Sequence, residues 1–115
     1  MDKNLDKLFF LLQNRKHSDH KKSYVSSLYN KGIKKILQKL KEEINELIIT
    51  IKNFKENKYK EKSLRYEIIK ETADVWLHSL ICISFLDILN TEIVEELSKR
   101  LNISGLEEKN NRLNN

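Results

Sequence analysis

The sequence predicts an all-α fold: a helical bundle of two long and two to three short helices, in a single domain spanning residues 1–115. The chain contains no proline and only two glycines, whereas β-hairpins and sandwich loops depend on glycine, Asn-Gly and proline turns. Its apolar residues also recur every three to four positions, which is the spacing of one face of an α-helix. A chain of this length buries about two-thirds of its unfolded surface, enough for one modest core.

Two short helices are expected before Gly32. Four apolar residues near the start follow the i, i+3, i+4, i+7 spacing: Leu5, Leu8, Phe9 and Leu12. They predict a helix over about residues 2–16. After a polar stretch, the pattern resumes from Tyr24 to Tyr29, and a glycine just beyond a helix favours its termination. We therefore expect a short helix that ends near Gly32.

Two long helices are expected in the middle of the chain. Eight apolar residues hold the 3.6-residue period: Ile33, Ile36, Leu37, Leu40, Ile44, Leu47, Ile48 and Ile51. They predict a helix roughly 30 Å long. Residues 53–63 are rich in Lys, Glu and Asn and lack this period, so we interpret them as an exposed connection. A second long helix is expected over about residues 64–89, with its apolar second half central to the core.

A last short helix is expected from an N-cap at Thr91 to about Asn102, with acidic residues in its first turns. The polar tail from Ile103 onward is expected to be irregular unless a ligand or partner orders it. So few helices cannot enclose a large hydrophobic core by themselves. We therefore expect a second subunit to complete the bundle in a homodimer.

Charge and cysteine content restrict the class of protein. The net charge is +5, but the lysines are interleaved with glutamates, which argues against a nucleic-acid surface and still allows a local phosphate site. Cys82 is the only cysteine, so no intrachain disulfide is possible and a buried thiol in a reducing cytoplasm is expected.

The uncharged stretch from Val75 to Leu86 falls short of the roughly 20 residues of a membrane span. The apolar run at residues 8–12 is shorter than the apolar core of a signal peptide, which has about 7 to 15 residues. We expect a soluble cytoplasmic protein with no membrane partner.

The first long helix carries charged residues beside its apolar stripe. Successive helical residues rotate by about 100°, so Glu43 and Glu46 lie about 60° apart on one flank of that stripe. Lys39 falls between them in angle one turn earlier, and Lys35 continues the line toward the helix start. The second long helix repeats the pattern.

On that second helix, Glu71 and Asp74 are about 60° apart, and His78 projects between them. The same face continues through Ile81 and Phe85, which we expect in the core. The carboxylates therefore lie at the margin of the core, where grouping them is costly unless a cation compensates.

Four carboxylates without a thiolate favour Mg²⁺, or Mn²⁺, over Zn²⁺. Magnesium is usually held by few carboxylates together with substrate phosphates, which predicts a polyphosphate ligand whose remaining charge Lys39 and Lys35 would meet. Acidic pairs three residues apart are also common on solvated helices. Spacing alone therefore leaves an enzyme and a non-catalytic helical interaction module equally open.

Residues along most of the chain follow one family pattern: Ser23-Tyr24, Leu28, Gly32, Lys35-Ile36, Lys39, Glu42-Glu43-x-x-Glu46, Glu71-x-Ala73-Asp74, His78, Ser104-Gly105-Leu106-Glu107-Glu108-Lys109 and Arg112. The pattern resembles the phosphoribosyl-ATP pyrophosphohydrolases, a branch of the all-α nucleoside triphosphate pyrophosphatase superfamily that also includes MazG-like enzymes. The acidic pairs are shared across the superfamily. The C-terminal segment from Ser104 to Arg112 is similar to the histidine-pathway branch alone.

This resemblance implies hydrolysis of the α-β phosphoanhydride of phosphoribosyl-ATP to phosphoribosyl-AMP and pyrophosphate, the second step of histidine biosynthesis. The residues that match the family's Mg²⁺-binding acids are Glu43, Glu46, Glu71 and Asp74. Glu43 and its neighbour Glu42 are the candidate catalytic residues, and Glu42 would accept a proton from the attacking water. The candidate phosphate- and substrate-binding residues are Lys35, Lys39, Tyr24, Lys109 and Arg112.

Several interpretations stay open. A MazG-like pyrophosphatase acting on dUTP or dCTP is the first alternative, and the non-catalytic module is the second. Tyr24 would either stack on a base or close a helix junction, and Lys109 and Arg112 would contact either the substrate or the second subunit. His78 is interpreted as a core histidine with one satisfied hydrogen bond, although substrate contact is also open. Trp76 is expected in the core or in a dimer interface.

The sequence departs from the family pattern at two places. Lys41 stands where the family usually has a glycine, and the connection from Phe54 to Tyr66 is longer than usual, which would alter access to the site. The family enzyme is often fused to a cyclohydrolase domain that nothing in this chain supplies. We therefore expect a stand-alone form, for which a separate cyclohydrolase is a possible partner.

Overall fold

The computed structural model describes residues 3–17, 23–56 and 62–101. These residues form five α-helices and one short 3-10 helix, without a strand: α1 (Lys3–Asn14), η1 (Arg15–His17), α2 (Tyr24–Lys31), α3 (Ile33–Glu56), α4 (Lys62–Phe85) and α5 (Asn90–Leu101). The all-α class is confirmed, with two long helices and three short ones in the described part of the chain.

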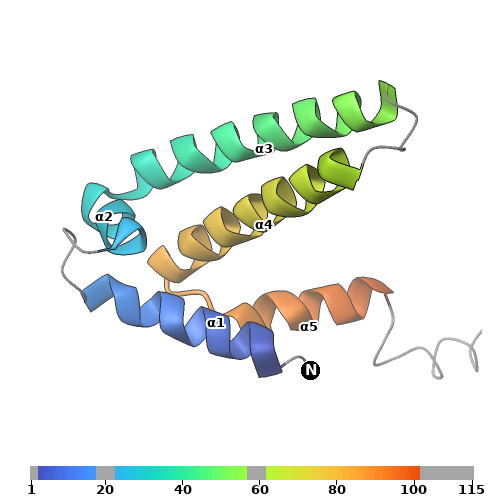
Figure 1. Ribbon diagram of the computed structural model, residues 1–115. Coiled ribbons are helices and arrows are strands. Elements are labelled where there is room, and N and C mark those ends of the chain that lie inside the picture. The colour runs from blue at the N-terminus through green and yellow to red at the C-terminus, as the bar shows by residue number, and fades with distance from the viewer. Residues whose placement is uncertain (1–2, 18–22, 57–61, 102–115) are drawn as a thin grey trace, which may run out of the picture.

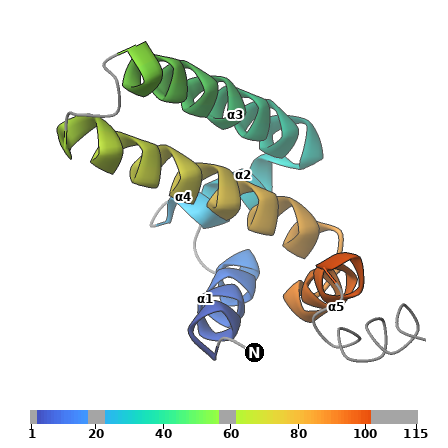
Figure 2. The same cartoon turned by 90° about the vertical axis from the view of Figure 1, so that its right-hand side faces the viewer.

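The two long helices form a hairpin that organises the rest of the molecule. Helices α3 and α4 lie side by side along their length, and α2 crosses at the start of α3 (Figure 1). Helices α1 and α5 lie on the side of α4 that faces away from α3, as both views show (Figure 2). Helix α4 is therefore the central element, with one face toward α3 and the other toward the short helices.

The hydrophobic core lies at the end of the hairpin where α1, α2 and the second half of α4 meet. Its buried residues are Leu12, Leu28, Tyr29, Ile36 and Ile81. The ring of Tyr29 stacks on Phe85 with 6.4 Å between centroids, and Cys82 packs partly buried against the same cluster. Burying each large apolar side chain contributes about 1.5–3 kcal/mol, so this cluster holds the helices together. The expectation that Ile81 and Phe85 belong to the core is confirmed.

Local signals set both ends of α2. Ser23 is the N-cap, and its hydroxyl accepts a hydrogen bond from the backbone N–H of Ser26 at 3.3 Å. At the other end Gly32 adopts φ 94°, a conformation that L-residues with a side chain rarely adopt, and its N–H donates to the carbonyl of Leu28. The predicted short helix and its glycine end are confirmed, and α3 starts directly after the glycine.

Two boundaries of the long helices differ from the prediction. Helix α3 continues through Glu56, so the exposed connection does not begin at residue 53. Lys and Glu are good helix formers, and they extend the helix beyond the end of its apolar stripe. Helix α4 begins at Lys62 and ends at Phe85, four residues before the expected end at Leu89.

A C-terminal cap ends α4 early. Asp87 adopts φ 59°, its N–H donates to the carbonyl of Ser84 at 3.0 Å, and the N–H of Ile88 donates to the carbonyl of Ile83 at 2.9 Å. This pair of bonds is the Schellman arrangement, which usually places glycine in the left-handed position. Aspartate is one of the few other residues that tolerate that position, so no glycine marked this helix end in the sequence.

The start of α5 also differs from the prediction, because the helix begins at Asn90 and Thr91 lies inside its first turn. The residue before the helix is Leu89, whose backbone N–H donates to the Glu92 carboxylate at 2.8 Å. A glutamate three residues after the cap position satisfies that donor in the same way in a capping box. The N-cap expected at Thr91 was therefore wrong, and Glu92 supplies the capping contact. The expected irregular tail from Ile103 lies outside the described residues.

Across the described ranges, no single helix has both the length and the apolar content that crossing a membrane requires. Taken together, α4 and α5 reach that length and composition, but they are bent by 116° at the break between them.

Candidate active site

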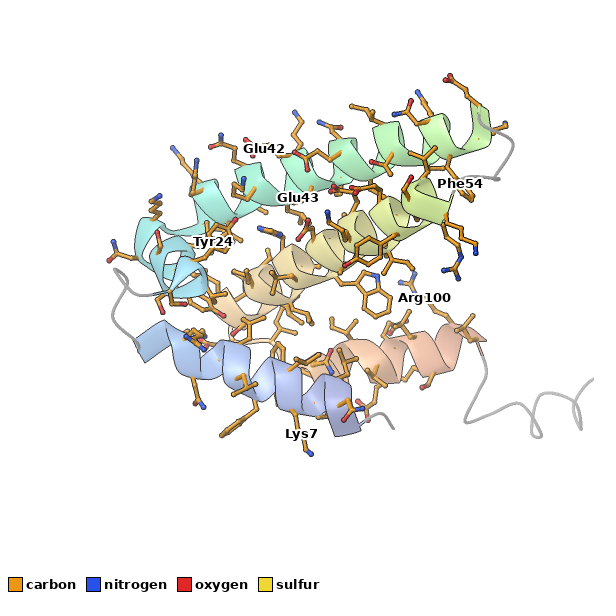
Figure 3. All side chains as sticks on the ribbon, viewed as in Figure 1. Lys7, Tyr24, Glu42, Glu43, Phe54 and Arg100 are labelled. Atoms are coloured by element: carbon orange, nitrogen blue, oxygen red, sulfur yellow. The ribbon has the colours of Figure 1, made fainter. Side chains whose placement is uncertain are left out.

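Three carboxylates from the two long helices converge in the space between α3 and α4. Oxygens of Glu43 and Glu46 on α3 and of Glu71 on α4 all lie within 4.8 Å of one another, the only such group among the described residues. Figure 3 shows Glu43 on the side of α3 that faces α4. We call these three residues the carboxylate cluster.

The helical period explains the convergence. Residues three apart lie on one face of a helix, so Glu43 and Glu46 point in similar directions from α3, toward the helix that carries Glu71. Glu43 is 8% exposed and is one of the buried residues of α3, whereas Glu46 is exposed at the mouth of the cluster. The cluster is therefore open to solvent on one side and closed on the other.

The protein atoms described neutralise the cluster only in part. Burial raises the pKa of Glu43, and the negative charges of Glu46 and Asp74 raise it further. Burial likewise raises the pKa of Glu71, followed by the charges of the same two neighbours. The Oε2 atoms of Glu43 and Glu71 are buried without a hydrogen-bond partner in the described part of the chain. Such groups are costly to bury, so the arrangement has room for a cation that would satisfy them.

Asp74 lies beside the cluster. Its charge acts on both Glu43 and Glu71, but its oxygens are not in the group within 4.8 Å. The structure thus brings together three of the four acids expected to bind a metal and places the fourth next to them. The donors available to a cation are carboxylate oxygens, as expected.

Lys39 lies at the α3 edge of the cluster. Its ammonium is 3.0 Å from Oε2 of Glu42 and 4.0 Å from Oε1 of Glu43. Glu42 also accepts a hydrogen bond from the Gln38 side chain at 3.1 Å. The hydrogen bonds from Lys39 and then Gln38 lower the pKa of Glu42, and the charge of Lys35 lowers it as well.

These contacts define separate places for the expected residues of α3. Glu42 is outside the carboxylate cluster, on a half-exposed surface where it holds Lys39. Lys35 lies near enough to Glu42 for its charge to act on that carboxylate. A lowered pKa makes Glu42 a weaker base than an ordinary carboxylate.

Tyr24 and His78 connect α2 to α4 beside the cluster. The Tyr24 hydroxyl is 2.8 Å from Nε2 of His78, and Nδ1 of His78 is 2.7 Å from the backbone carbonyl of Asp74. His78 is buried, as expected for a core histidine, and is 3% exposed. Its contact with Tyr24 was not predictable from the sequence, since 54 residues separate the two and no local pattern links them.

A cavity of about 570 Å³ lies on the other side of Tyr24, between α1, α2 and α4. Its lining is mostly apolar: Leu5, Leu8, Leu11, Leu12, Arg15, Ser23, Tyr24, Val25, Ala73, Trp76, Leu77 and Leu80. Trp76 is 62% exposed there, so of its two expected places the core is excluded, and the dimer interface stays a prediction. None of the three clustered carboxylates lines the cavity, which leaves Tyr24 as the boundary between an apolar and an acidic region.

Two expected substrate-binding residues, Lys109 and Arg112, lie outside the described residues. The same is true of the whole segment from Ser104 to Arg112, on which the distinction between branches of the superfamily rested.

Comparison with known proteins gives a consistent result along the chain. The family model for phosphoribosyl-ATP pyrophosphohydrolase matches residues 5–101. A phosphoribosyl-ATP pyrophosphatase of Vesicomyosocius okutanii subsp. Calyptogena okutanii (strain HA) is 45% identical over 114 residues, covering 99% of this chain and 100% of the relative. A protein of the same name from Ruthia magnifica subsp. Calyptogena magnifica is 41% identical over 110 residues, covering 96% of each chain. The resemblance found in the sequence is confirmed, and the chain belongs to the phosphoribosyl-ATP pyrophosphohydrolase family.

Proposed function

We propose that this chain hydrolyses the α-β phosphoanhydride of phosphoribosyl-ATP, releasing pyrophosphate and phosphoribosyl-AMP in the second step of histidine biosynthesis. Both relatives carry the name of that activity over nearly their full length. The structural observation that supports the proposal is the carboxylate cluster, with two buried oxygens that the described residues leave unpartnered.

The cluster fits Mg²⁺, with Mn²⁺ as a substitute. Its donors are carboxylate oxygens, which hard divalent cations prefer, and its two unpartnered oxygens are the atoms a cation would satisfy. Glu43, Glu46 and Glu71 would hold the ion, and the charge of Asp74, which acts on Glu43, would add to its attraction. Bound there, the ion would neutralise phosphate charge and activate the attacking water.

Chain residues around the cluster supply the other requirements of the reaction. Lys39, fixed by Glu42, would stabilise the charge that develops on the departing pyrophosphate, and Lys35 would extend this positive edge. We assign Glu42 to orienting Lys39, because its lowered pKa suits an ion pair better than proton transfer. Glu43, inside the cluster, is the better placed of the two candidate catalytic carboxylates to take the proton of the water. Tyr24, Lys109 and Arg112 stay predicted substrate contacts.

Pyrophosphate release from phosphoribosyl-ATP, measured with and without Mg²⁺, tests the proposal. Glu43→Gln is expected to abolish release, whereas the matched variant Glu95→Gln, on the exposed surface of α5, is expected to retain it. Robust hydrolysis of dUTP or dCTP without any release from phosphoribosyl-ATP would favour the MazG-like alternative. Absence of all three activities, with no thermal shift on adding Mg²⁺ and pyrophosphate, would favour the non-catalytic module.

A homodimer is proposed as the working form. Long apolar side chains on the two hairpin helices are exposed: Leu37, Ile44, Ile48, Ile49 and Ile51 on α3, and Tyr66, Ile69 and Trp76 on α4. Apolar surface of this extent on a small chain is typical of an interface. Sedimentation of a stable monomer at micromolar concentration would contradict the proposal. The cytoplasmic location and a separate cyclohydrolase partner also stay predictions.

A further inference from the structure

A short chain of hydrogen bonds runs from the backbone of α4 to the hydroxyl of Tyr24. The carbonyl oxygen of Asp74 can only accept, so Nδ1 of His78, 2.7 Å away, carries a proton and donates it. In the neutral imidazole Nε2 is then an acceptor, and the Tyr24 hydroxyl, 2.8 Å away, donates to it. The direction of each hydrogen bond is thus fixed by the one before it.

Tyr24 lies beside the carboxylate cluster, because its partner His78 is bound to the backbone of Asp74, the acid next to the cluster. In agreement, the charges of Lys39, Glu43 and Asp74 act on the Tyr24 hydroxyl. The side chain is 51% exposed, so water and a substrate reach it from solvent. Tyr24 is also the first residue of α2, and the Ser23 cap fixes the start of that helix.

The direction of these hydrogen bonds restricts which hydrogen bond Tyr24 can form with a ligand. A phenolic hydroxyl has one proton, and here that proton is engaged by His78, so the oxygen can only accept from any further partner. Phosphate oxygens are also acceptors, so they cannot form a hydrogen bond with the Tyr24 oxygen in this arrangement. A water molecule is a donor, and hydrolysis requires one that is held and oriented for attack.

We propose that the Tyr24 hydroxyl accepts a hydrogen bond from the water held at the carboxylate cluster, an inference that rests on the proposed hydrolysis. His78 is the positioning residue that restricts Tyr24 to this role. The Asp74 carbonyl fixes the imidazole, so the segment that carries one acid of the site also sets the orientation of Tyr24. A residue that only braced α2 against α4 would need the same contact but would act on stability alone.

Three single variants and one double variant separate these roles. Tyr24→Phe removes the acceptor and keeps the ring. In His78→Asn the side-chain amide lies at about the position of Nδ1, so the donor to the Asp74 carbonyl is kept and the acceptor for Tyr24 is lost. In His78→Gln the side-chain amide lies at about the position of Nε2 and its oxygen can accept from Tyr24, so this is the rescue variant. The double variant combines Tyr24→Phe with His78→Asn.

Steady-state pyrophosphate release from phosphoribosyl-ATP is the readout, with the melting temperature measured for every variant. Tyr24→Phe and His78→Asn are each expected to lower kcat about tenfold to a hundredfold, the usual range for partners that orient groups at a metal site. KM is expected to change little, because the acceptor engages the water and not the bound substrate. The double variant should lose no more than the worse single variant, and His78→Gln should recover part of the rate.

Each result either supports or overturns the proposal. Wild-type kcat in Tyr24→Phe would overturn it, even if the melting temperature fell. A double variant whose loss is the product of the two single losses would show that the residues act independently, which also overturns it. Failure of the wild-type protein to release pyrophosphate would instead refute the proposed function, so the two failures are distinguishable. Because Tyr24 is half-exposed, Tyr24→Phe remains informative if a His78 variant does not fold.

Discussion

Glu43→Gln is expected to stabilise the cation-free protein while it removes the activity. Glu43 is 8% exposed, and its Oε2 lacks a hydrogen-bond partner among the described residues. Two like charges 4.8 Å apart, the limit for the oxygens of this cluster, repel by about 3.5 kcal/mol at an effective dielectric constant of about 20. Glu46 is exposed, so solvent screening reduces its share. The Lys39 ammonium, 4.0 Å from Oε1 of Glu43, offsets a further part of the repulsion. Burial and the net repulsion still disfavour the charged form, so we expect the free energy of unfolding to rise by about 1 kcal/mol.

The pH dependence of this effect has a definite sign. Burial and two negative neighbours raise the pKa of Glu43 in the folded protein above its ordinary value. Between the two values the folded state binds more protons than the unfolded state, so stability falls as pH rises through the folded pKa. Wild type therefore loses the contribution of Glu43 as pH rises toward neutral. Glu43→Gln removes that part of the loss, whereas the part due to the raised pKa of Glu71 remains in both proteins. The advantage of the variant should be present at pH 7 to 8 and should largely vanish near pH 4.5, the ordinary pKa of a glutamate.

Thermal or urea unfolding in EDTA, at pH 7.5 and near pH 4.5 and at one protein concentration, measures this difference. A gain of about 1 kcal/mol corresponds to a melting temperature several degrees higher for a domain of about this size. Glu95→Gln, exposed on α5, is the control and should match wild type. Added Mg²⁺ should stabilise wild type more than Glu43→Gln, which reverses or reduces the difference. A less stable Glu43→Gln at neutral pH without cation would refute the reasoning.

Three further substitutions test other parts of the structure. Lys39→Met should lower kcat for pyrophosphate release on the order of a hundredfold, because Lys39 is proposed to contact the departing phosphates. Lys41→Met, at an exposed neighbour, is the control and should keep kcat within about twofold of wild type. Equal losses in the two variants would contradict the proposed phosphate contact. Gly32→Ala should cost about 1–2 kcal/mol in urea unfolding through backbone strain at φ 94°, because no atom lies within 4 Å of the added methyl; an unchanged midpoint would count against it. Ser23→Ala should cost about 1 kcal/mol by removing the cap of α2, and Ser23→Asp should restore it.

Patterns along the chain were sufficient to predict most helices and the convergence of the acids. An apolar period of 3.6 residues identifies a helix because the core needs one continuous face, and α3 follows it. Helix α4 shows almost no such period, because its second half is apolar on nearly every side, and its length and composition indicated a central helix instead. Acids three residues apart share a flank of their helix whatever the tertiary structure, so Glu43 and Glu46 had to point together. The pairing of Lys39 with Glu42, three residues apart within α3, was likewise within reach of helical geometry.

Features that depend on tertiary contacts or on an unusual backbone conformation were missed. The left-handed residue that ends α4 is Asp87, and an aspartate is not a distinctive stop signal in a sequence. The hydrogen bond between Tyr24 and His78 joins residues far apart in the chain, so it exists only once α2 has packed on α4. The choice between the two places expected for Trp76 also needed the tertiary structure, because its exposure depends on which face of α4 the short helices leave uncovered.

The core and the carboxylate cluster occupy different stretches of the same hairpin, which makes its local stability uneven. Buried residues of α4 are confined to its second half, at His78, Ile81 and Ser84, and those of α3 are Ile36 and Glu43. Amide protons near Ile81 should therefore exchange only on global unfolding, whereas those near the start of α4 and the end of α3 should exchange by local fraying. Since Glu71 lies in the less protected stretch, we expect the hairpin to open at the end away from the core without unfolding of the whole domain.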